Sequence, residues 1–171
     1  MRVLQVRRER PGDEAAVRAV HRAAFARGDG EPVEAPLVDA LRVDPGWLPH
    51  LSLVAVGDGA VVGHTVATRA TVDGRPVVGL GPIGVLPAAQ GRGVGTALMY
   101  ALLGAAQAGG ETLVGLLGEP AYYGRFGFVA ASELGVHAPE PAWGRYFQAL
   151  ALTEEAPTGT FRYAAPFDGL G

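Results

Sequence analysis

A glycine-rich stretch in the middle of the chain joins an apolar segment to an amphipathic one. Residues 76–85 have the pattern of a strand and residues 94–108 that of a helix, and the connection carries glycine at positions 91, 93 and 95. Such a strand–loop–helix turn exposes several backbone N–H groups at the positive end of the helix dipole, with no side chains in the way. The sequence therefore predicts a binding site for a phosphate or pyrophosphate group at this turn.

Two common phosphate-binding motifs do not fit this stretch. A P-loop ends in lysine followed by Ser or Thr, whereas all 14 basic residues of this chain are arginine. A dinucleotide-binding turn separates its second and third glycines by two residues, whereas the three glycines here alternate. What remains is the pattern Gln-x-x-Gly-x-Gly, formed by Gln90, Gly93 and Gly95.

A second motif follows farther along the chain, where Tyr123, Gly127 and Phe128 form Tyr-x-x-x-Gly-Phe. The first motif resembles the acetyl-coenzyme A loop of the GCN5-related N-acetyltransferase (GNAT) family, and the second resembles the segment after the fifth strand in many members. Residues 118–128 most resemble a bacterial subgroup, the YhbS-like acetyltransferases. The resemblance covers roughly positions 1–152.

The order of elements agrees with this family's α/β (α+β) fold, a mixed and mostly antiparallel central sheet with a splayed strand pair and flanking helices. Hydrophobic residues make up 49% of the 171 residues, enough for one domain with its own core. We expect a single domain over 1–171, with a core of about 1–152 and a C-terminal extension of about 153–171. Hydrophobic patterning predicts the following elements. The strands are 3–7, 51–56, 60–70, 76–85, 112–117, 126–131, 147–152 and 158–163. The first helix starts after Asp13, its expected N-cap, and the other helices cover 33–41, 94–108 and 119–125.

Glycines inside the strand at 76–85 indicate where that strand departs from regular pairing. Gly79, Gly81 and Gly84 lie within it, and glycine in a strand often marks a bulge or a close backbone approach. A bulge near Gly81-Pro82 would separate this strand from the next and open a slot for an extended ligand such as pantetheine.

The resemblance implies acetyl-coenzyme A as cosubstrate, with its pyrophosphate on the N–H groups of the glycine-rich loop and its pantetheine paired with the backbone of the preceding strand. The residues expected to bind it are Ile83, Gly84, Val85, Gln90, Gly91, Arg92, Gly93, Val94, Gly95 and Thr96.

Tyr123, the tyrosine that matches the second motif, is the expected catalytic residue, because a phenol near the sulfur can donate a proton to the leaving thiolate. Tyr122 is the alternative, more suited to packing against its neighbours or to lining the acceptor site. Many family members carry an asparagine just before this segment, and residues 116–120 contain none.

The acceptor side offers three further candidates. Glu31 and Glu34 can bind an amine or relay its proton, although acidic residues are also favoured at a solvated helix start. His64 lies in a predicted strand and faces either the slot or the core. His21, His50 and His137 have no evident partner, and the four histidines lack metal-ligand spacing, so we expect no metal.

Covalent catalysis is disfavoured, because cysteine is absent and neither Ser52 nor Ser132 lies in a Gly-x-Ser-x-Gly motif. The expected reaction is direct attack of an acceptor amine, a small molecule or peptide, on the thioester in a ternary complex. A non-catalytic acyl-coenzyme A sensor and a longer-chain acyltransferase remain alternatives.

A net charge of −3 argues against nucleic acid as a partner. Residues 1–10 lack the apolar core of a signal peptide, and no apolar run reaches membrane-spanning length, so we expect a cytoplasmic protein without membrane contact. Edge strands near the C-terminus are compatible with a homodimer.

Overall fold

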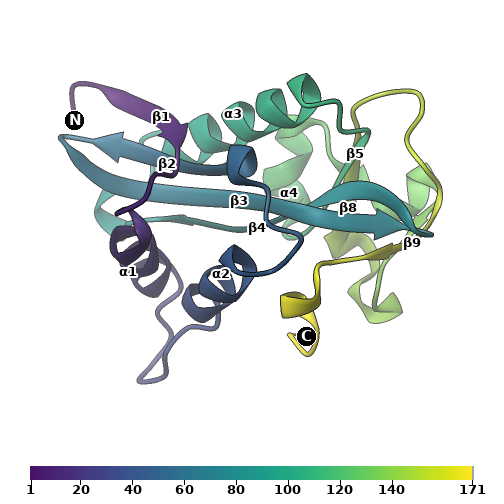
Figure 1. The fold of residues 1–171 in the computed structure, drawn as a ribbon, viewed down its shortest axis with the longest axis horizontal. Coiled ribbons are helices and arrows are strands. Elements are labelled where there is room, and N and C mark those ends of the chain that lie inside the picture. Colours follow the sequence, from purple (N-terminus) through teal and green to yellow (C-terminus); the bar gives the residue numbers. More distant parts are fainter. Residues whose placement is uncertain (171) are drawn as a thin grey trace.

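The structure, a computed structural model that describes residues 1–170, is built on one mixed sheet with helices on both faces (Figure 1). Within the described residues the sheet has nine strands, with β1-β2-β3-β4-β5-β8-β6 as its main order and with β9 joining β3 to β7. Helices α1 and α2 cover one face, and α3 and α4 lie on the other. The predicted mixed, mostly antiparallel fold is confirmed. The strands are β1 Leu4–Arg8, β2 Ser52–Gly57, β3 Ala60–Val72, β4 Arg75–Val85, β5 Leu113–Leu117, β6 Val129–Ala130, β7 Val136–His137, β8 Phe147–Ala151 and β9 Gly159–Arg162, and the helices are α1 Glu14–Ala24, α2 Glu34–Arg42, α3 Val94–Ala108 and α4 Pro120–Tyr123.

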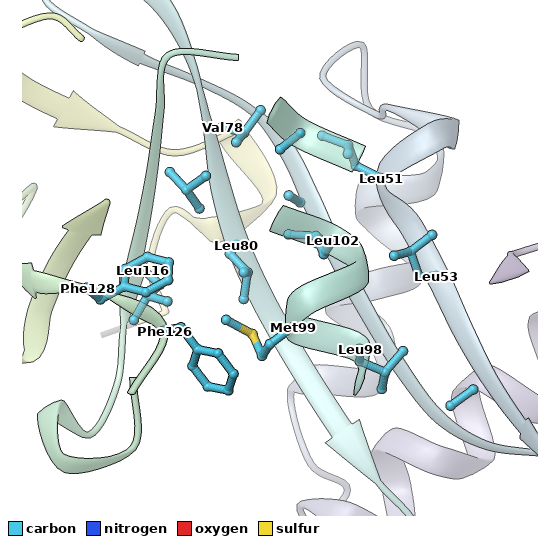
Figure 2. Packing of buried hydrophobic residues seen from close by; sticks show 14 of the residues in the cluster. Leu51, Leu53, Val78, Leu80, Leu98, Met99, Leu102, Leu116, Phe126 and Phe128 are labelled. Atoms are coloured by element: carbon cyan, nitrogen blue, oxygen red, sulfur yellow. The ribbon is translucent and has the colours of Figure 1, made fainter. Parts of the chain in front are cut away.

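Alternation along β2 places side chains on the two faces of the sheet. Leu53 packs in the main core with α3, whereas the next residue, Val54, packs with Val17 of α1 and Val38 of α2. In the main core, α3 lies on the sheet through Leu98, Met99 and Leu102, and Phe126 and Phe128 extend this core beyond the end of β5 (Figure 2). The core thus fixes the start of α3 against the sheet. Within residues 1–170, no helix is long and apolar enough to cross a membrane.

Strands β4 and β5 separate as the sequence predicts. Their parallel pairing consists of Val78 with Val114 and Gly79 with Gly115, yet β4 continues to Val85. On its other edge, β4 shows a register shift between the pairs Thr65–Ile83 and Ala67–Leu80 of β3, which places the bulge at residues 81–82. The backbone of β4 beyond Leu80 therefore diverges from β5 on the side facing that strand.

Two local predictions differ from the structure. The strand expected over 126–131 is only Val129–Ala130, because residues 124–126 form a short 3₁₀ turn and Gly127 adopts a φ of 95°. Asp13 lies just before α1, but its carboxylate accepts hydrogen bonds from Arg7 and from the backbone N–H of Arg10 rather than capping the helix.

The segment after residue 152 is integral to the sheet. Strand β9 pairs with β3 through Thr71–Arg162 and Val72–Phe161. A Cβ added at Gly115 would lie 2.5 Å from the ring of Phe161, and one added at Gly79 would lie 2.7 Å from the ring of Tyr163. Aromatic rings of the C-terminal segment therefore occupy the space over the last paired residues of β4 and β5.

Candidate functional site

The glycine-rich loop has the backbone that an anion site requires. Gly91 and Gly93 have φ values of 73° and 80°, in the left-handed region that favours glycine. Gly93 immediately precedes α3, whose first residue is Val94. No protein atom lies within 4 Å of a Cβ built at Gly91 or Gly93. The first N–H groups of a 15-residue helix consequently lie next to open space.

Two side chains fix this loop to its surroundings. The amide nitrogen of Gln90 donates a 3.1 Å hydrogen bond to the carbonyl oxygen of Val85, at the end of β4. A Cβ at Gly95 would lie 2.9 Å from the hydroxyl oxygen of Tyr122, so this glycine lets Tyr122 pack over the first turn of α3. Arg92 is exposed and Thr96 is half-buried. Gln90 thus connects the loop to the strand instead of pointing away from the protein.

A pocket of about 260 Å³ lies beside the diverging part of β4. Phe25, Glu34 and Leu37 contribute to it from the α1–α2 side, and Tyr123 contributes from α4. The remaining wall residues are 80–83 of β4, 116–117 of β5, and Trp143, Tyr163, Phe167 and Leu170. Of the predicted site residues, the pocket brings together Ile83, Glu34 and Tyr123.

Tyr123 is the last residue of α4 and lies against the end of β5. Gly118 makes this position possible, because a Cβ there would overlap the Tyr123 ring. Gly118 is itself held by a 2.9 Å hydrogen bond from the Gln148 amide nitrogen to its carbonyl oxygen. Burial, with a smaller contribution from Tyr122, raises the pKa of Tyr123 to about 12. The phenol therefore keeps its proton at neutral pH and can donate it.

The two predicted glutamates differ in their surroundings. The Glu31 carboxylate accepts a 2.8 Å hydrogen bond from Arg22 in an exposed ion pair. Glu34 is half-buried at the start of α2 and lines the pocket. Among the described residues, no ion pair involves Glu34. Glu34 is thus the carboxylate that the pocket offers to a ligand.

His64 lies in the core and does not line the pocket, which is the second of the two orientations that the sequence left open. It is fully buried, and its Nδ1 lies 2.8 Å from Nε2 of His21. Its Nε2 lies 2.9 Å from the hydroxyl of Ser52. His21, for which the sequence indicated no partner, is therefore paired. Tyr122 also lies outside the pocket, stacked edge-on against Phe126.

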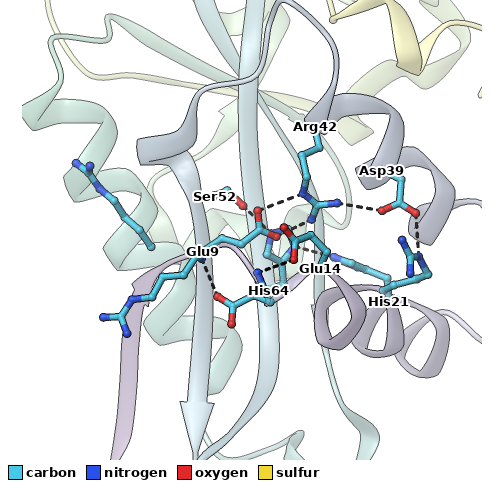
Figure 3. A network of polar contacts seen from close by, with 12 residues as sticks. Glu9, Glu14, His21, Asp39, Arg42, Ser52 and His64 are labelled. Atoms are coloured by element: carbon cyan, nitrogen blue, oxygen red, sulfur yellow. Dashed lines mark hydrogen bonds and ion pairs between the residues drawn. The ribbon is translucent and has the colours of Figure 1, made fainter.

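The histidine pair belongs to a polar network between α1, α2 and the sheet (Figure 3). Glu9 accepts a hydrogen bond from Arg42, and its Oε1 lies 4.0 Å from Nε2 of His64. Arg42 also donates to Asp39, which accepts from Arg18 as well. The network fixes α1 and α2 against β2 and β3. These helices position two pocket residues, Phe25, which directly follows α1, and Glu34, the first residue of α2.

Sequence reasoning missed the part of the pocket that comes from the C-terminal segment. Tyr163 stacks on Phe161 and Phe167, with ring centroids 4.8 and 4.6 Å apart. Burial, with a smaller contribution from Tyr123, raises the pKa of Tyr163. The grouping of aromatic residues at 161, 163 and 167 was the available indication, but its contact with β4 depends on the pairing of β9 with β3.

The chain matches the model of the acetyltransferase (GNAT) family over residues 16–128. It is 35% identical over 164 residues to the uncharacterized N-acetyltransferase YjhQ of Escherichia coli, covering 90% of this chain and 88% of the relative. It is 34% identical over 157 residues to the uncharacterized N-acetyltransferase YhbS of the same species, covering 90% of each chain.

Solved structures agree with this relationship. The crystal structure of E. coli YhbS in complex with coenzyme A superposes with a TM-score of 0.89 at 31% identity, covering 98% of this chain and 93% of that one. A Brucella melitensis GNAT acetyltransferase in complex with acetyl-coenzyme A gives a TM-score of 0.81 at 37% identity, covering 98% of this chain and all of that one. On its sequence, its fold and these relatives, the chain belongs to the GNAT family of N-acetyltransferases.

Proposed function

We propose that this chain transfers an acetyl group from acetyl-coenzyme A directly to a primary amine in a ternary complex. The observation that carries the proposal is one arrangement, in which the open edge of β4 and the protonated phenol of Tyr123 line a single pocket, and the glycine-rich loop follows the end of the same strand. Coenzyme A and acetyl-coenzyme A are bound in the two solved relatives.

The residues present fit this cosubstrate. Positive φ values at Gly91 and Gly93 turn the loop so that backbone N–H groups, from Gly91 to Thr96, are free to hold the pyrophosphate. The backbone of β4 from Ile83 to Val85 would pair with pantetheine as an added strand. The Gln90–Val85 hydrogen bond would keep these two contact regions in fixed register.

The side chains of the pocket supply the groups that acetyl transfer requires. Glu34 binds the ammonium form of the acceptor and takes up its proton, directly or through water. The amine nitrogen then forms a bond to the thioester carbon while the carbon–sulfur bond breaks. Tyr123 donates its phenolic proton to the departing sulfur, and a backbone N–H of β4 polarises the carbonyl. The nitrogen releases its second proton to solvent as the amide forms, and Tyr123 regains a proton from solvent. Holding both reactants in one pocket lowers the barrier further through proximity.

Isothermal titration with acetyl-coenzyme A tests the cosubstrate, using wild type, Gly93→Glu and Gly104→Glu. Gly104 is exposed on the same helix, and no protein atom lies within 4 Å of its Cβ, so it is a matched control for added charge. We expect micromolar binding by wild type and Gly104→Glu, and loss of binding in Gly93→Glu with the fold retained by circular dichroism. Equal binding by both variants, or no binding by folded wild type, would refute the proposed loop site.

A further inference from the structure

The pocket beside Tyr123 is lined by many apolar side chains and few charged ones, which limits the positive charge that it can bind. Its described wall residues include one charged side chain, that of Glu34, and this carboxylate lacks an ion-pair partner among residues 1–170. The other side chains are aliphatic or aromatic, apart from the phenol groups of Tyr123 and Tyr163. One positive charge can therefore be neutralised there, and a second cannot.

The residues that line the pocket fall into two groups, one beside the expected thioester and one available to contact the rest of the acceptor. Residues 80–83 of β4, Leu116 and Tyr123 lie where the thioester would arrive under the proposed function. Leu37 of α2 and Phe167 form another part of the wall, and both belong to one apolar cluster with Leu41 and Trp47. The space around this cluster remains for the part of the acceptor that does not react.

From this arrangement we infer that the acceptor is a small primary amine with an apolar body, whose ammonium group contacts Glu34 and whose body packs against Leu37, Trp143, Phe167 and Leu170. This inference rests on the proposed function and narrows the acceptor to a chemical class. A polyamine would bury a second ammonium group among apolar side chains, where no partner compensates the loss of its hydration. The pocket volume of about 260 Å³ lies below the roughly 300–1,000 Å³ typical of drug-sized ligands, which favours a small acceptor.

The C-terminal segment is the element that determines this preference. Phe167 and Leu170 follow β9, and they reach the pocket because the 3₁₀ turn at Ala165–Phe167 redirects the chain toward α2. Leu170 is 38% exposed, so its side chain is at the rim and can be exchanged without disturbing the core. An acidic residue at this position would provide a second site for a positive charge.

The experiment compares pentylamine with 1,4-diaminobutane as acceptors, with acetyl-coenzyme A and purified full-length enzyme. The two amines have the same length, and they differ in a terminal methyl group against a second ammonium group. We expect kcat/KM for pentylamine to exceed that for the diamine at least tenfold. We also expect kcat/KM to rise from propylamine to pentylamine by roughly 15-fold, because each of the two added methylenes contributes about fourfold when buried.

Two variants test whether the named wall residues are responsible. Leu170→Asp should lower the ratio of kcat/KM for pentylamine to kcat/KM for the diamine by at least fivefold, with the KM for acetyl-coenzyme A unchanged. Phe167→Ala should flatten the rise from propylamine to pentylamine, and thermal unfolding would report any loss of the fold. Leu170→Ser is the neutral control for Leu170→Asp.

Equal or faster acetylation of the diamine by wild type would overturn the inference and leave the proposed function intact. Acetylation of neither amine by enzyme that binds acetyl-coenzyme A would also overturn it. In that case a peptide with a free N-terminus would test the proposed function separately. If the ratio of kcat/KM for the two amines is unchanged in Leu170→Asp, then the C-terminal segment does not determine the preference for an apolar amine.

Discussion

The imidazoles of His21 and His64 meet inside the protein, with Nε2 of His21 2.8 Å from Nδ1 of His64 and with both side chains fully buried. Their rings are perpendicular, with centroids 5.0 Å apart. Nδ1 of His21 has no hydrogen-bond partner among the described residues and lies against Gly84, where a Cβ would come within 2.9 Å of it. The pair therefore joins α1 to the strand that adjoins the pocket, and its burial opposes protonation.

This contact predicts a loss of stability in mild acid. Burial, and then the nearby Arg42 guanidinium, lower the pKa of His21 to about 4, and burial also lowers the pKa of His64. The unfolded chain binds protons as the pH falls below about 6.5, while the folded His21 stays neutral until about pH 4. The contribution of neutral His21 to the free energy of unfolding is therefore complete above pH 6.5. As the pH falls below 6.5 this contribution is lost progressively, by roughly 3 kcal/mol for His21 alone.

Urea unfolding between pH 7.5 and 4.5 measures this dependence. His21→Gln should flatten the profile, since it removes a titrating group while keeping a polar side chain. His137→Gln replaces an exposed histidine and should leave the slope unchanged. Identical slopes for wild type and His21→Gln would contradict the assignment.

Tyr123→Phe should lower kcat by about 100-fold or more, because general acid catalysis typically contributes 10²–10⁴. The affinity for acetyl-coenzyme A should stay within about twofold, since the ring still fills the space beside Gly118. With its pKa near 12, Tyr123 remains protonated over the working range. Its ionisation should therefore cause no alkaline decline of kcat below about pH 10.

Tyr122→Phe is the matched control, because Tyr122 lies next to Tyr123 but outside the pocket. Its kcat should stay within a few-fold of wild type. If steady-state kinetics show the larger loss of kcat in Tyr122→Phe, then Tyr122 and not Tyr123 is the proton donor. Tyr163→Phe completes the series, since a loss as large as that of Tyr123→Phe would identify Tyr163 as the proton donor.

Arg69 and Glu111 form a bidentate ion pair, with both nitrogen–oxygen distances at 2.8 Å. Glu111 is only 8% exposed, so Arg69→Met would leave its carboxylate without its ion-pair partner. We expect a loss of about 2–4 kcal/mol in the free energy of unfolding at pH 7. The double variant Arg69→Met/Glu111→Leu should recover most of it, and equal losses in both would argue that packing, not the unpaired charge, is responsible.

Local patterns were sufficient to predict the parts of the site that lie close together in the sequence. The glycine-rich loop, α3 and the bulge at residues 81–82 depend on neighbouring residues, and the structure contains all three. The contact between His21 and His64 spans 43 positions. Nothing in the local sequence of either residue specifies it, because it depends on how α1 lies over β3.

The same reasoning explains why the pocket was only half predicted. Ile83, Glu34 and Tyr123 were expected from a motif or from their place before a helix, and all three line it. Tyr163 and Phe167 reach the pocket through the path of the C-terminal segment, which follows from the pairing of β9 with β3. That pairing joins residues about 90 positions apart, and hydrophobic alternation predicts strands but does not specify their partners.

Gly115 tests whether the C-terminal segment is needed for the fold itself. A Cβ on this residue would lie 2.5 Å from the Phe161 ring, and Phe161 is fully buried, so the ring has to move. Gly115→Ala should therefore cost about 1–3 kcal/mol, the usual effect of overpacking a core. Gly104→Ala is the opposite case, because Gly104 is exposed within α3 and a Cβ there meets no atom within 4 Å.

Alanine replaces glycine without strain in the middle of a helix, so Gly104→Ala should stabilise the protein by up to about 1 kcal/mol. Chemical denaturation of the two variants beside wild type gives both signs in one experiment. Because Tyr163 stacks on Phe161, Gly115→Ala should also raise the KM for the acceptor amine, whereas Gly104→Ala should not. A neutral effect of Gly115→Ala on both stability and KM would mean that Phe161 and Tyr163 are free to shift, and that the C-terminal wall of the pocket is not held by the packing of Phe161 on β5.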